Sequence, residues 1–191
     1  MKHGLELAAS VAAAFMVFTT NPARAANWVV DPAHSHFGFS GVQVGAPFKG
    51  EFRKLDSKIS YDPEHPESAH VVVTIDMASA HTGDTQRDAA LPQPEWFDTA
   101  KFPTATFEAA GFHPKGGQAW ETPGKLSVRG IGRDVVLPFT LALNGDTAHA
   151  TGHVQLVRTA FGVGQGAWSS GDWVALEVGV DLDLVVRKEG S

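Results

Sequence analysis

The residues best suited to chemistry in this sequence are two histidines, His34 and His36, on either side of Ser35. In a strand, residues two apart point to the same face at roughly 6.5–7 Å, so two imidazoles there could share one zinc ion. A third ligand would be needed, and the chain has no His-Glu-x-x-His or similar metal motif. The pattern favours two histidines on the polar face of a strand. A metal-dependent enzyme that uses His34 and His36 is the alternative.

The remaining histidines and the usual catalytic signatures add no second centre. His149 and His153 lie roughly 13 Å apart along a strand and cannot chelate one ion together. Asp84, Arg87 and Asp88 have the i, i+3, i+4 spacing of an ion-pair set on a short helix. No Gly-x-Ser-x-Gly motif is present, and residues 161–166 (FGVGQG) are not the dinucleotide-binding Gly-x-Gly-x-x-Gly.

Cysteine is absent, which excludes disulfides, thiol catalysis and thiolate metal sites. We therefore expect a protein that is not an enzyme and has no catalytic residue, metal or cofactor. The formal net charge of −6 also disfavours binding to nucleic acid or to anionic membrane surfaces.

Alternating apolar and polar residues indicate that strands position most side chains of this chain. The clearest run has apolar residues at every odd position from 135 to 143, and Asn144-Gly145 then predicts a hairpin turn. Residues 148–156 and 174–184 alternate in the same way, with His149 and His153 facing outward. The other predicted strands are 27–31, 34–41, 46–61, 70–77, 104–112 and 126–129.

One interval, residues 83–101, breaks the alternation and contains Pro92 and Pro94. Asp84 is expected to cap a short helix that runs through Ala90, with a second turn at 95–100. The pattern predicts a single all-β domain with one helical insertion. Such a chain forms either a sandwich or a closed barrel, and the alternation alone does not separate the two.

The N-terminus predicts a secretory signal peptide over residues 1–25. Lys2 supplies positive charge, residues 7–18 are mostly apolar, and Ala23-Arg24-Ala25 is a cleavage site of the Ala-x-Ala type. The apolar run is shorter than the roughly 20 residues that a membrane span needs. We expect cleavage between Ala25 and Ala26, which leaves a mature domain of residues 26–191 in the periplasm.

Aromatic residues are abundant in the mature chain, which keeps all 5 Trp and most of the 12 Phe. Any one of them is more simply a core residue, but together they suit an apolar barrel that encloses a lipid. The expected lining residues from strands are Phe37, Phe39, Phe107, Leu126, Phe139, Val154 and Leu156, and those near an entrance are Phe97 and Trp168.

An ordered series of motifs resembles the bacterial YceI-like family. The motifs cover the mature chain: 28–35 (WVVDPAHS), 37–39 (FGF), 48–52 (FKGEF), 79–84 (SAHTGD), 87–88 (RD), 95–98 (EWFD), 101–107 (KFPTATF), 124–130 (GKLSVRG) and 133–135 (RDV). The resemblance implies an extended eight-stranded antiparallel lipocalin-like barrel in the periplasm that binds a polyisoprenoid. The chain departs from the family at Val42-Gln43 and at residues 158–161, where head-group contacts are expected to differ.

The resulting hypothesis is a lipid carrier whose ligand is a polyisoprenoid lipid or an isoprenoid quinone. Residues 83–101 and 162–172 are expected to control access to the barrel. An interaction module for a membrane redox protein, such as one of the cytochrome b561 type, is a further alternative, and homodimerisation is left open.

Overall fold

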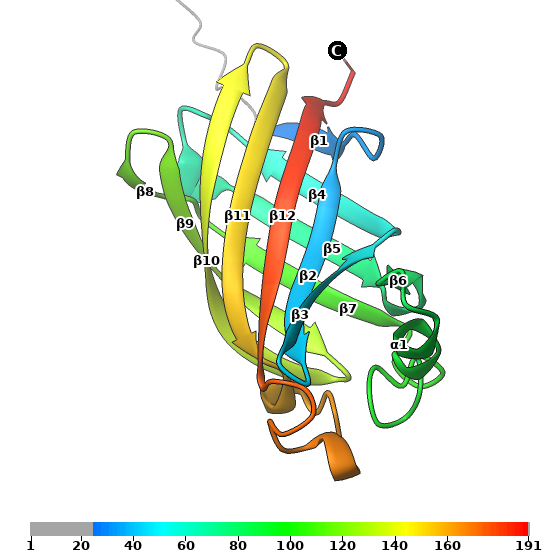
Figure 1. Ribbon diagram of the computed structural model, residues 1–191. Helices are drawn as coiled ribbons and strands as arrows, with labels where there is room; N and C mark the ends of the chain where they lie inside the picture. Colours follow the sequence, from blue (N-terminus) through cyan, green and yellow to red (C-terminus); the bar gives the residue numbers. More distant parts are fainter. Residues whose placement is uncertain (1–24, 191) are drawn as a thin grey trace, which may run out of the picture.

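The alternating segments form one antiparallel sheet that closes on itself (Figure 1). The computed structural model describes residues 25–190, so the predicted signal peptide lies almost entirely outside the described residues. Eight strands make the closed barrel, and β12 pairs back to β1. In order around the barrel these strands are β1 (Ala26–Val30), β4 (Leu55–Tyr61), β5 (His70–Asp76), β7 (Thr104–Ala110), β9 (Ala119–Val128), β10 (Ile131–Asn144), β11 (Thr147–Val157) and β12 (Glu177–Lys188).

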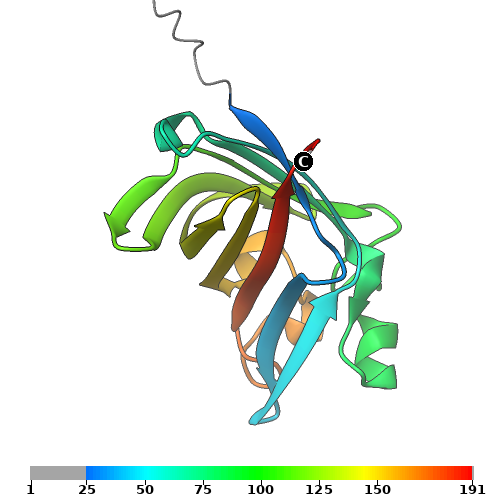
Figure 2. The same ribbon diagram turned by 90° about the horizontal axis from the view of Figure 1, so that it is seen from above.

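Three more strands lengthen the barrel at one end, namely β2 (His36–Gln43), β3 (Ala46–Phe52) and β6 (Ala80–His81). Both β1 and β2 pair with β12, through Trp28 opposite Lys188 and Phe37 opposite Leu182. The turn at Pro32 separates β1 from β2, because proline lacks the N–H that a strand ladder needs. The short β8 (His113–Gly116) pairs with β9. Seen from above, the strands surround the interior (Figure 2). The choice between sandwich and barrel is thus settled in favour of the barrel.

Several strand boundaries differ from the expected ones, and the single strand expected at 46–61 is two strands, because residues 46–52 pair with β2 whereas residues 55–61 pair with β1 and β5. Asn144 pairs with Thr147 in the last rung between β10 and β11, so the turn residues are Gly145 and Asp146 rather than Asn144 and Gly145. The strand expected at 126–129 is β9, which begins at Ala119 and tolerates Pro123 because the β7 ladder stops at Gly124. The strand expected at 174–184 is β12, which begins at Glu177.

Residues before β12 pair elsewhere, which explains its late start. Val174 forms an isolated bridge with Gln43, and the Ala175 N–H donates to the Val42 carbonyl at 2.9 Å. These bonds attach the segment to the end of β2 rather than to β11.

The helical insertion contains α1 (Thr85–Ala90), the only α-helix in residues 25–190. Asp84 caps it as expected, because its side chain accepts from the N–H groups of Gln86 and Arg87 at 3.0 and 2.9 Å. The chain also has four 3-10 turns, η1 (Pro66–Ser68), η2 (Met77–Ser79), η3 (Arg158–Phe161) and η4 (Gly166–Trp168). Among the described residues, no helix has the length and apolar character of a membrane span.

Two apolar clusters lie at different ends of the barrel. One includes Met77, Leu91, Phe97 and Phe161, which come from the segments around α1 and from η3. The other is built from Trp28, Tyr61, Ala69, Ala148 and Val186, around β1 and the C-terminal part of β12. No large side chain in residues 25–190 is completely buried, so the interior between the clusters is not filled like an ordinary core.

Two glycines in the barrel wall let aromatic rings lie flat against it. The ring of Phe39 covers Gly50, its partner across the strands, so closely that a Cβ at Gly50 would overlap it. A Cβ at Gly124 would lie 2.7 Å from the ring of Phe107. Each ring occupies the space that the side chain of a larger residue would fill at the glycine position. The rings therefore lie against the wall of the barrel rather than across its interior.

We predict that Gly50→Ala lowers the free energy of unfolding by about 1–3 kcal/mol, because the new methyl group must displace the Phe39 ring. Equilibrium unfolding in urea measures the change. The matched control is Gly132→Ala, whose Cβ would lie 3.3 Å from the flexible Lys125 side chain and 3.4 Å from Ser127 Oγ and should change stability little. Equal stability of the two variants would show that the packing of the Phe39 ring does not require a glycine at position 50.

Candidate functional site

A cavity of about 270 Å³ occupies the interior of the barrel. One water molecule needs about 10–15 Å³ of such space, so the cavity has room for a much larger molecule. All eight strands of the closed barrel contribute side chains to it. Further contributions come from β2, β3, the insertion (residues 83–101) and the loop after η3 (residues 162–176). The surface that faces the cavity is apolar, although five residues with polar side-chain atoms contribute to the lining, namely Trp28, Tyr61, Trp96, Thr122 and Arg158.

Eight of the nine residues expected to line the barrel face this cavity. They are Phe37, Phe39, Phe97, Phe107, Leu126, Phe139, Val154 and Leu156. Contact of these side chains with a ligand stays a prediction. Trp168 is not among the lining residues. It lies in η4, where its ring centroid is 5.5 Å from that of Trp96, and Trp96 is the tryptophan that reaches the cavity.

Arg158 is a charged lining residue outside the expected set of nine, although it continues the inward series of Val154 and Leu156 by the same period of two. Its side chain is 3 % exposed. The guanidinium donates to the backbone carbonyls of Val163, Gly164, Trp168, Ser170, Val174 and Ala175, at 2.7–3.4 Å. A charged residue at an inward position is therefore compatible with the barrel because carbonyl oxygens solvate it.

No described carboxylate pairs with Arg158 within residues 25–190. Burial lowers the pKa of its guanidinium from the ordinary value, since the charged form loses hydration. The guanidinium carbon also lies 5.4 Å from the centroid of the Trp96 ring. Arg158 thus joins the loop that follows η3 to the wall of the cavity and to the insertion.

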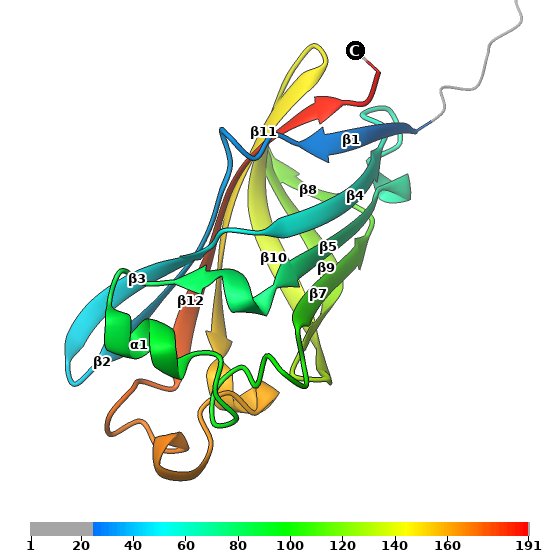
Figure 3. The same cartoon turned by 90° about the vertical axis from the view of Figure 1, so that its right-hand side faces the viewer.

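The insertion and the loop after η3 also bond to each other directly. The N–H groups of Gly164 and Gln165 both donate to the Glu95 carbonyl at 2.8 Å. Arg129 of the β9–β10 turn donates to the carbonyls of Pro94 and Trp96. These bonds close the end of the barrel at which α1, η3 and η4 lie (Figure 3).

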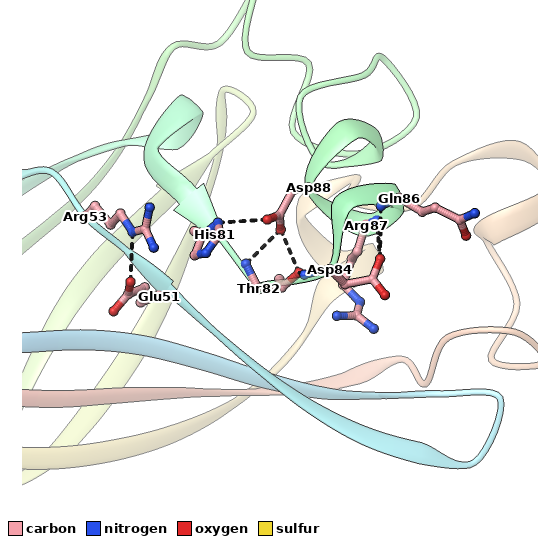
Figure 4. Close-up of polar contacts among 8 residues, drawn as sticks. All are labelled: Glu51, Arg53, His81, Thr82, Asp84, Gln86, Arg87 and Asp88. Atoms are coloured by element: carbon pink, nitrogen blue, oxygen red, sulfur yellow. Dashed lines mark hydrogen bonds and ion pairs between the residues drawn. The ribbon is translucent and has the colours of Figure 1, made fainter.

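The charged residues of α1 attach the helix to the barrel and do not form the expected ion-pair set with one another (Figure 4). Asp88 accepts the backbone N–H and hydroxyl of Thr82 at 2.7 and 2.6 Å, and its other oxygen lies 2.8 Å from His81 Nδ1. Burial acts to raise the pKa of Asp88, but the hydrogen bonds from Thr82, the charge of His81 and the N–H of Gly83 together lower it. Arg87 donates to the side chain of Gln43 at 3.1 Å and stacks over Phe48.

The two histidines considered for a metal site do not converge. His34 lies in the turn before β2 and pairs with Asp31 at 2.9 Å, whereas His36 begins β2 and lies 3.5 Å from Glu51. The expectation that both belong to one strand is wrong, because the chain turns after Pro32. Across the described part of the chain, no three His, Cys, Asp or Glu side chains are arranged to hold a metal ion.

His149 and His153 face outward, as the alternation predicts. His149 Nε2 lies 2.6 Å from Asp183, and His153 Nδ1 lies 2.7 Å from Asp181. The hydrogen bond to Asp181 raises the pKa of His153 above its ordinary value and outweighs the opposing effect of burial.

Comparison with known proteins agrees with this architecture. Residues 28–186 match the family model described as the YceI-like domain. The UPF0312 protein of Vibrio cholerae is 32% identical over 118 residues, which are 60% of this chain and 62% of that protein. This chain therefore spans somewhat less than two thirds of that relative. Protein YceI of Salmonella arizonae is 31% identical over 136 residues, or 70% of this chain and 71% of that protein.

Solved structures show the same barrel. The crystal structure of BcnA from Burkholderia cenocepacia aligns with a TM-score of 0.78 at 34% identity and covers 82% of this chain and 98% of that one. A domain from Saccharophagus degradans, described as a polyisoprenoid binding domain, aligns with a TM-score of 0.68 at 14% identity, over 85% of this chain and 99% of that one. The second similarity concerns the fold alone.

We predict that Arg158→Met lowers the free energy of unfolding by about 3–5 kcal/mol, because six carbonyls lose their buried donor. Urea unfolding measures the loss, and limited proteolysis is expected to cut the loop 162–176 first. The control is Arg133→Met, which removes an exposed arginine that also donates to a carbonyl, at 3.2 Å. If the loop 162–176 resisted proteolysis equally in both variants, Arg158 would not be the residue that holds it in place.

We predict that Asp181→Asn lowers the pKa of His153 toward 6.5, its ordinary value. The raised pKa of the folded state stabilises the protein fully below 6.5, and this contribution disappears as pH rises through the folded-state pKa. The stability difference between wild type and variant should therefore be larger in acid and shrink in base. NMR titration of the histidine resonances tests this, and curves of the other histidines should not change. An unchanged His153 curve would refute the coupling.

Proposed function

The chain belongs to the YceI-like family, and from this premise we propose that it is a lipid-binding protein without catalytic activity. In this proposal the barrel holds a polyisoprenoid chain or an isoprenoid quinone for transport, storage or sequestration. The observation that carries it is the cavity, whose lining is almost entirely apolar. The polyisoprenoid binding domain of Saccharophagus degradans, which has the same fold, supports the choice of ligand class.

Apolar burial alone is sufficient for useful affinity. Each buried methylene contributes about 0.8 kcal/mol, so ten contribute about 8 kcal/mol, and this corresponds to roughly micromolar binding before the costs of association. The 12 residues of β12 extend over about 40 Å, which suits a long chain lying along the barrel axis. A ligand held in this way needs few directional polar contacts, which is consistent with the absence of a catalytic motif in the sequence.

The end of the barrel closed by the insertion and the loop after η3 is the proposed route of access. Phe97 and Trp96 of the insertion and Val163 of the loop line the cavity at this end. The hydrogen bonds to Glu95 are few and lie between two segments without regular structure, so they can break without disturbing the strand ladder. Opening of residues 83–101 against 162–172 would expose the apolar interior.

The periplasm is the proposed setting, on the strength of the predicted signal peptide of residues 1–25. In that compartment an apolar lipid must cross water between two membranes, and an enclosed barrel would shield it. A membrane redox protein as partner, which a quinone ligand would suit, and a homodimer stay predictions. No feature of the described residues favours an enzyme that uses His34 and His36.

We predict that protein purified in its mature form releases a long-chain isoprenoid on organic extraction, and that native mass spectrometry shows the corresponding adduct. Ala150→Phe, which adds a ring inside the cavity, should lower ligand occupancy at least severalfold. The matched control is His149→Phe on the outer face of the same strand, which should leave occupancy unchanged. Delipidated protein that takes up neither quinones nor prenyl lipids would contradict the proposal.

A further inference from the structure

An exposed apolar patch, which we call the apolar tip, lies at the end of the barrel at which η3 and η4 lie. It consists of Val42, Val44, Val157, Trp173 and Leu176, five of the eight large apolar residues that are exposed in residues 25–190. The turn between β2 and β3 and the loop before β12, which carry most of these residues, lie at the same end of the molecule (Figure 1, Figure 3). Exposed apolar patches of this kind mark surfaces that bind a membrane or another protein.

Backbone hydrogen bonds hold the two segments of the apolar tip together. The Val44 N–H donates to the Trp173 carbonyl at 2.8 Å, and the Ala175 N–H donates to the Val42 carbonyl at 2.9 Å. The fold therefore places these apolar side chains next to one another as a fixed surface.

Val44 takes its place in the apolar tip at a conformational cost. Its φ is +49° and that of Gly45 is +77°, and the two residues form the turn between β2 and β3. A β-branched side chain is strongly disfavoured in this left-handed region, whereas asparagine is common at this position of such a turn. Because the Val44 side chain is 69 % exposed, packing within the described chain offsets little of the cost. A contact outside the chain would offset it.

The size of the apolar tip suits a bilayer better than a stable protein partner. A stable protein–protein interface takes about 20–30 residues from each side. Reversible membrane binding needs only that a few apolar side chains enter the interfacial region of the bilayer. Tryptophan is enriched at that depth, and Trp173 is 58 % exposed.

The apolar tip is also joined to both segments that are proposed to control access to the cavity. Trp173 directly follows residues 162–172, and Gln43, which precedes Val44, accepts a hydrogen bond from Arg87 of α1 at 3.1 Å. A bilayer bound at the tip would therefore lie beside the proposed route of access. A lipid would then pass between membrane and barrel with little exposure to water.

The charges near the apolar tip favour a bilayer without net charge. Exposed Lys49 and Glu177 both line the shallow groove beside Val42, and the carboxylate of Asp172 directly precedes Trp173. Attraction to anionic lipids depends on a cluster of Lys and Arg side chains. Here two carboxylates accompany one exposed lysine, so apolar burial must supply the binding and anionic head groups would oppose it.

We propose that the apolar tip docks on the surface of a bilayer with zwitterionic head groups, with Val44 and Trp173 inserted among them. The lipid enters and leaves the barrel from this contact. The exchange rests on the proposed lipid-binding function, and the inference adds the surface at which it takes place.

Flotation of the mature protein with phosphatidylcholine vesicles tests the docking. Val44→Asn and Trp173→Gln should each lower the vesicle-water partition coefficient roughly 3- to 10-fold, because each removes an inserted apolar side chain. Asparagine suits the turn, so Val44→Asn should not lower the free energy of unfolding, and lost docking is thereby separated from misfolding. The matched control is Val136→Thr, an exposed valine of β10 outside the tip, which should leave the partition coefficient unchanged.

Vesicles that mix phosphatidylcholine with phosphatidylglycerol test the charge argument. Wild type should bind them more weakly than phosphatidylcholine alone at low salt. Stronger binding to the anionic vesicles would overturn the choice of a zwitterionic surface. Wild type that binds neither vesicle but forms a dimer that Val44→Asn and Trp173→Gln dissociate would overturn the docking and assign the tip to a second copy of the chain.

Brominated acyl chains identify the part of the protein that meets the bilayer, because bromine quenches tryptophan fluorescence on contact. Trp173 is the only exposed tryptophan in residues 25–190. Quenching by vesicles of brominated phosphatidylcholine should therefore be largely lost in Trp173→Gln. Quenching that this variant leaves unchanged would show that another face contacts the bilayer and would refute the proposal.

The outcomes separate the docking from the function on which the exchange rests. Wild-type protein that yields a lipid on organic extraction but floats with neither vesicle would overturn the docking alone. Wild-type protein that floats through the apolar tip but neither contains nor takes up a lipid would overturn the lipid-binding function, and the exchange with it.

Discussion

The closed end of this barrel depends on the hydrogen bonds that Arg158 donates to the backbone carbonyls of the loop after η3. A cation buried beside an apolar cavity is stable only if other groups replace its water, and here six backbone carbonyls do so. Those carbonyls belong to residues 163–175, so the loop must wrap around the guanidinium to satisfy it. Gly164 lies so close to Arg158 that a Cβ would overlap it. Through Gly164 and Glu95 the same loop bonds to the insertion, and one side chain thereby organises both segments that cover the cavity.

A cavity leaves side chains without packing partners, whereas a stable fold needs well-packed side chains. In this barrel the packed clusters and the cavity lie in different places. Most of the buried apolar residues belong to the two end clusters, around Met77 and Phe161 at one end and around Trp28 and Tyr61 at the other. Between them, glycines in the wall receive the rings of Phe39 and Phe107. The continuous strand ladder from β1 to β12 replaces the packing that the interior lacks.

Most of the ion pairs between side chains lie on the outer face of the barrel. His149 and His153 pair with aspartates across β11 and β12, and His81 and Asp88 attach α1 to the barrel. These histidines stabilise the surface and the insertion, and none of them reaches the cavity lining. The division follows from the period of two along each strand, which gives one face to the ligand cavity and the other to solvent.

The sequence by itself determined what depends on near neighbours along the chain. Alternation placed Phe139, Val154 and Leu156 on an inward face, and the position of Asp84 before α1 predicted its cap. The tertiary structure decided what depends on distant partners. Closure requires β12 to pair with β1, β9 accommodates Pro123 because the β7 ladder stops at Gly124, and His34 lies in a turn rather than in a strand. The environments of Arg158 and Tyr61 were also decided by the fold, because the loop that follows Arg158 had to wrap around it and the rings against Tyr61 come from Trp28 and Phe112, far away in the sequence.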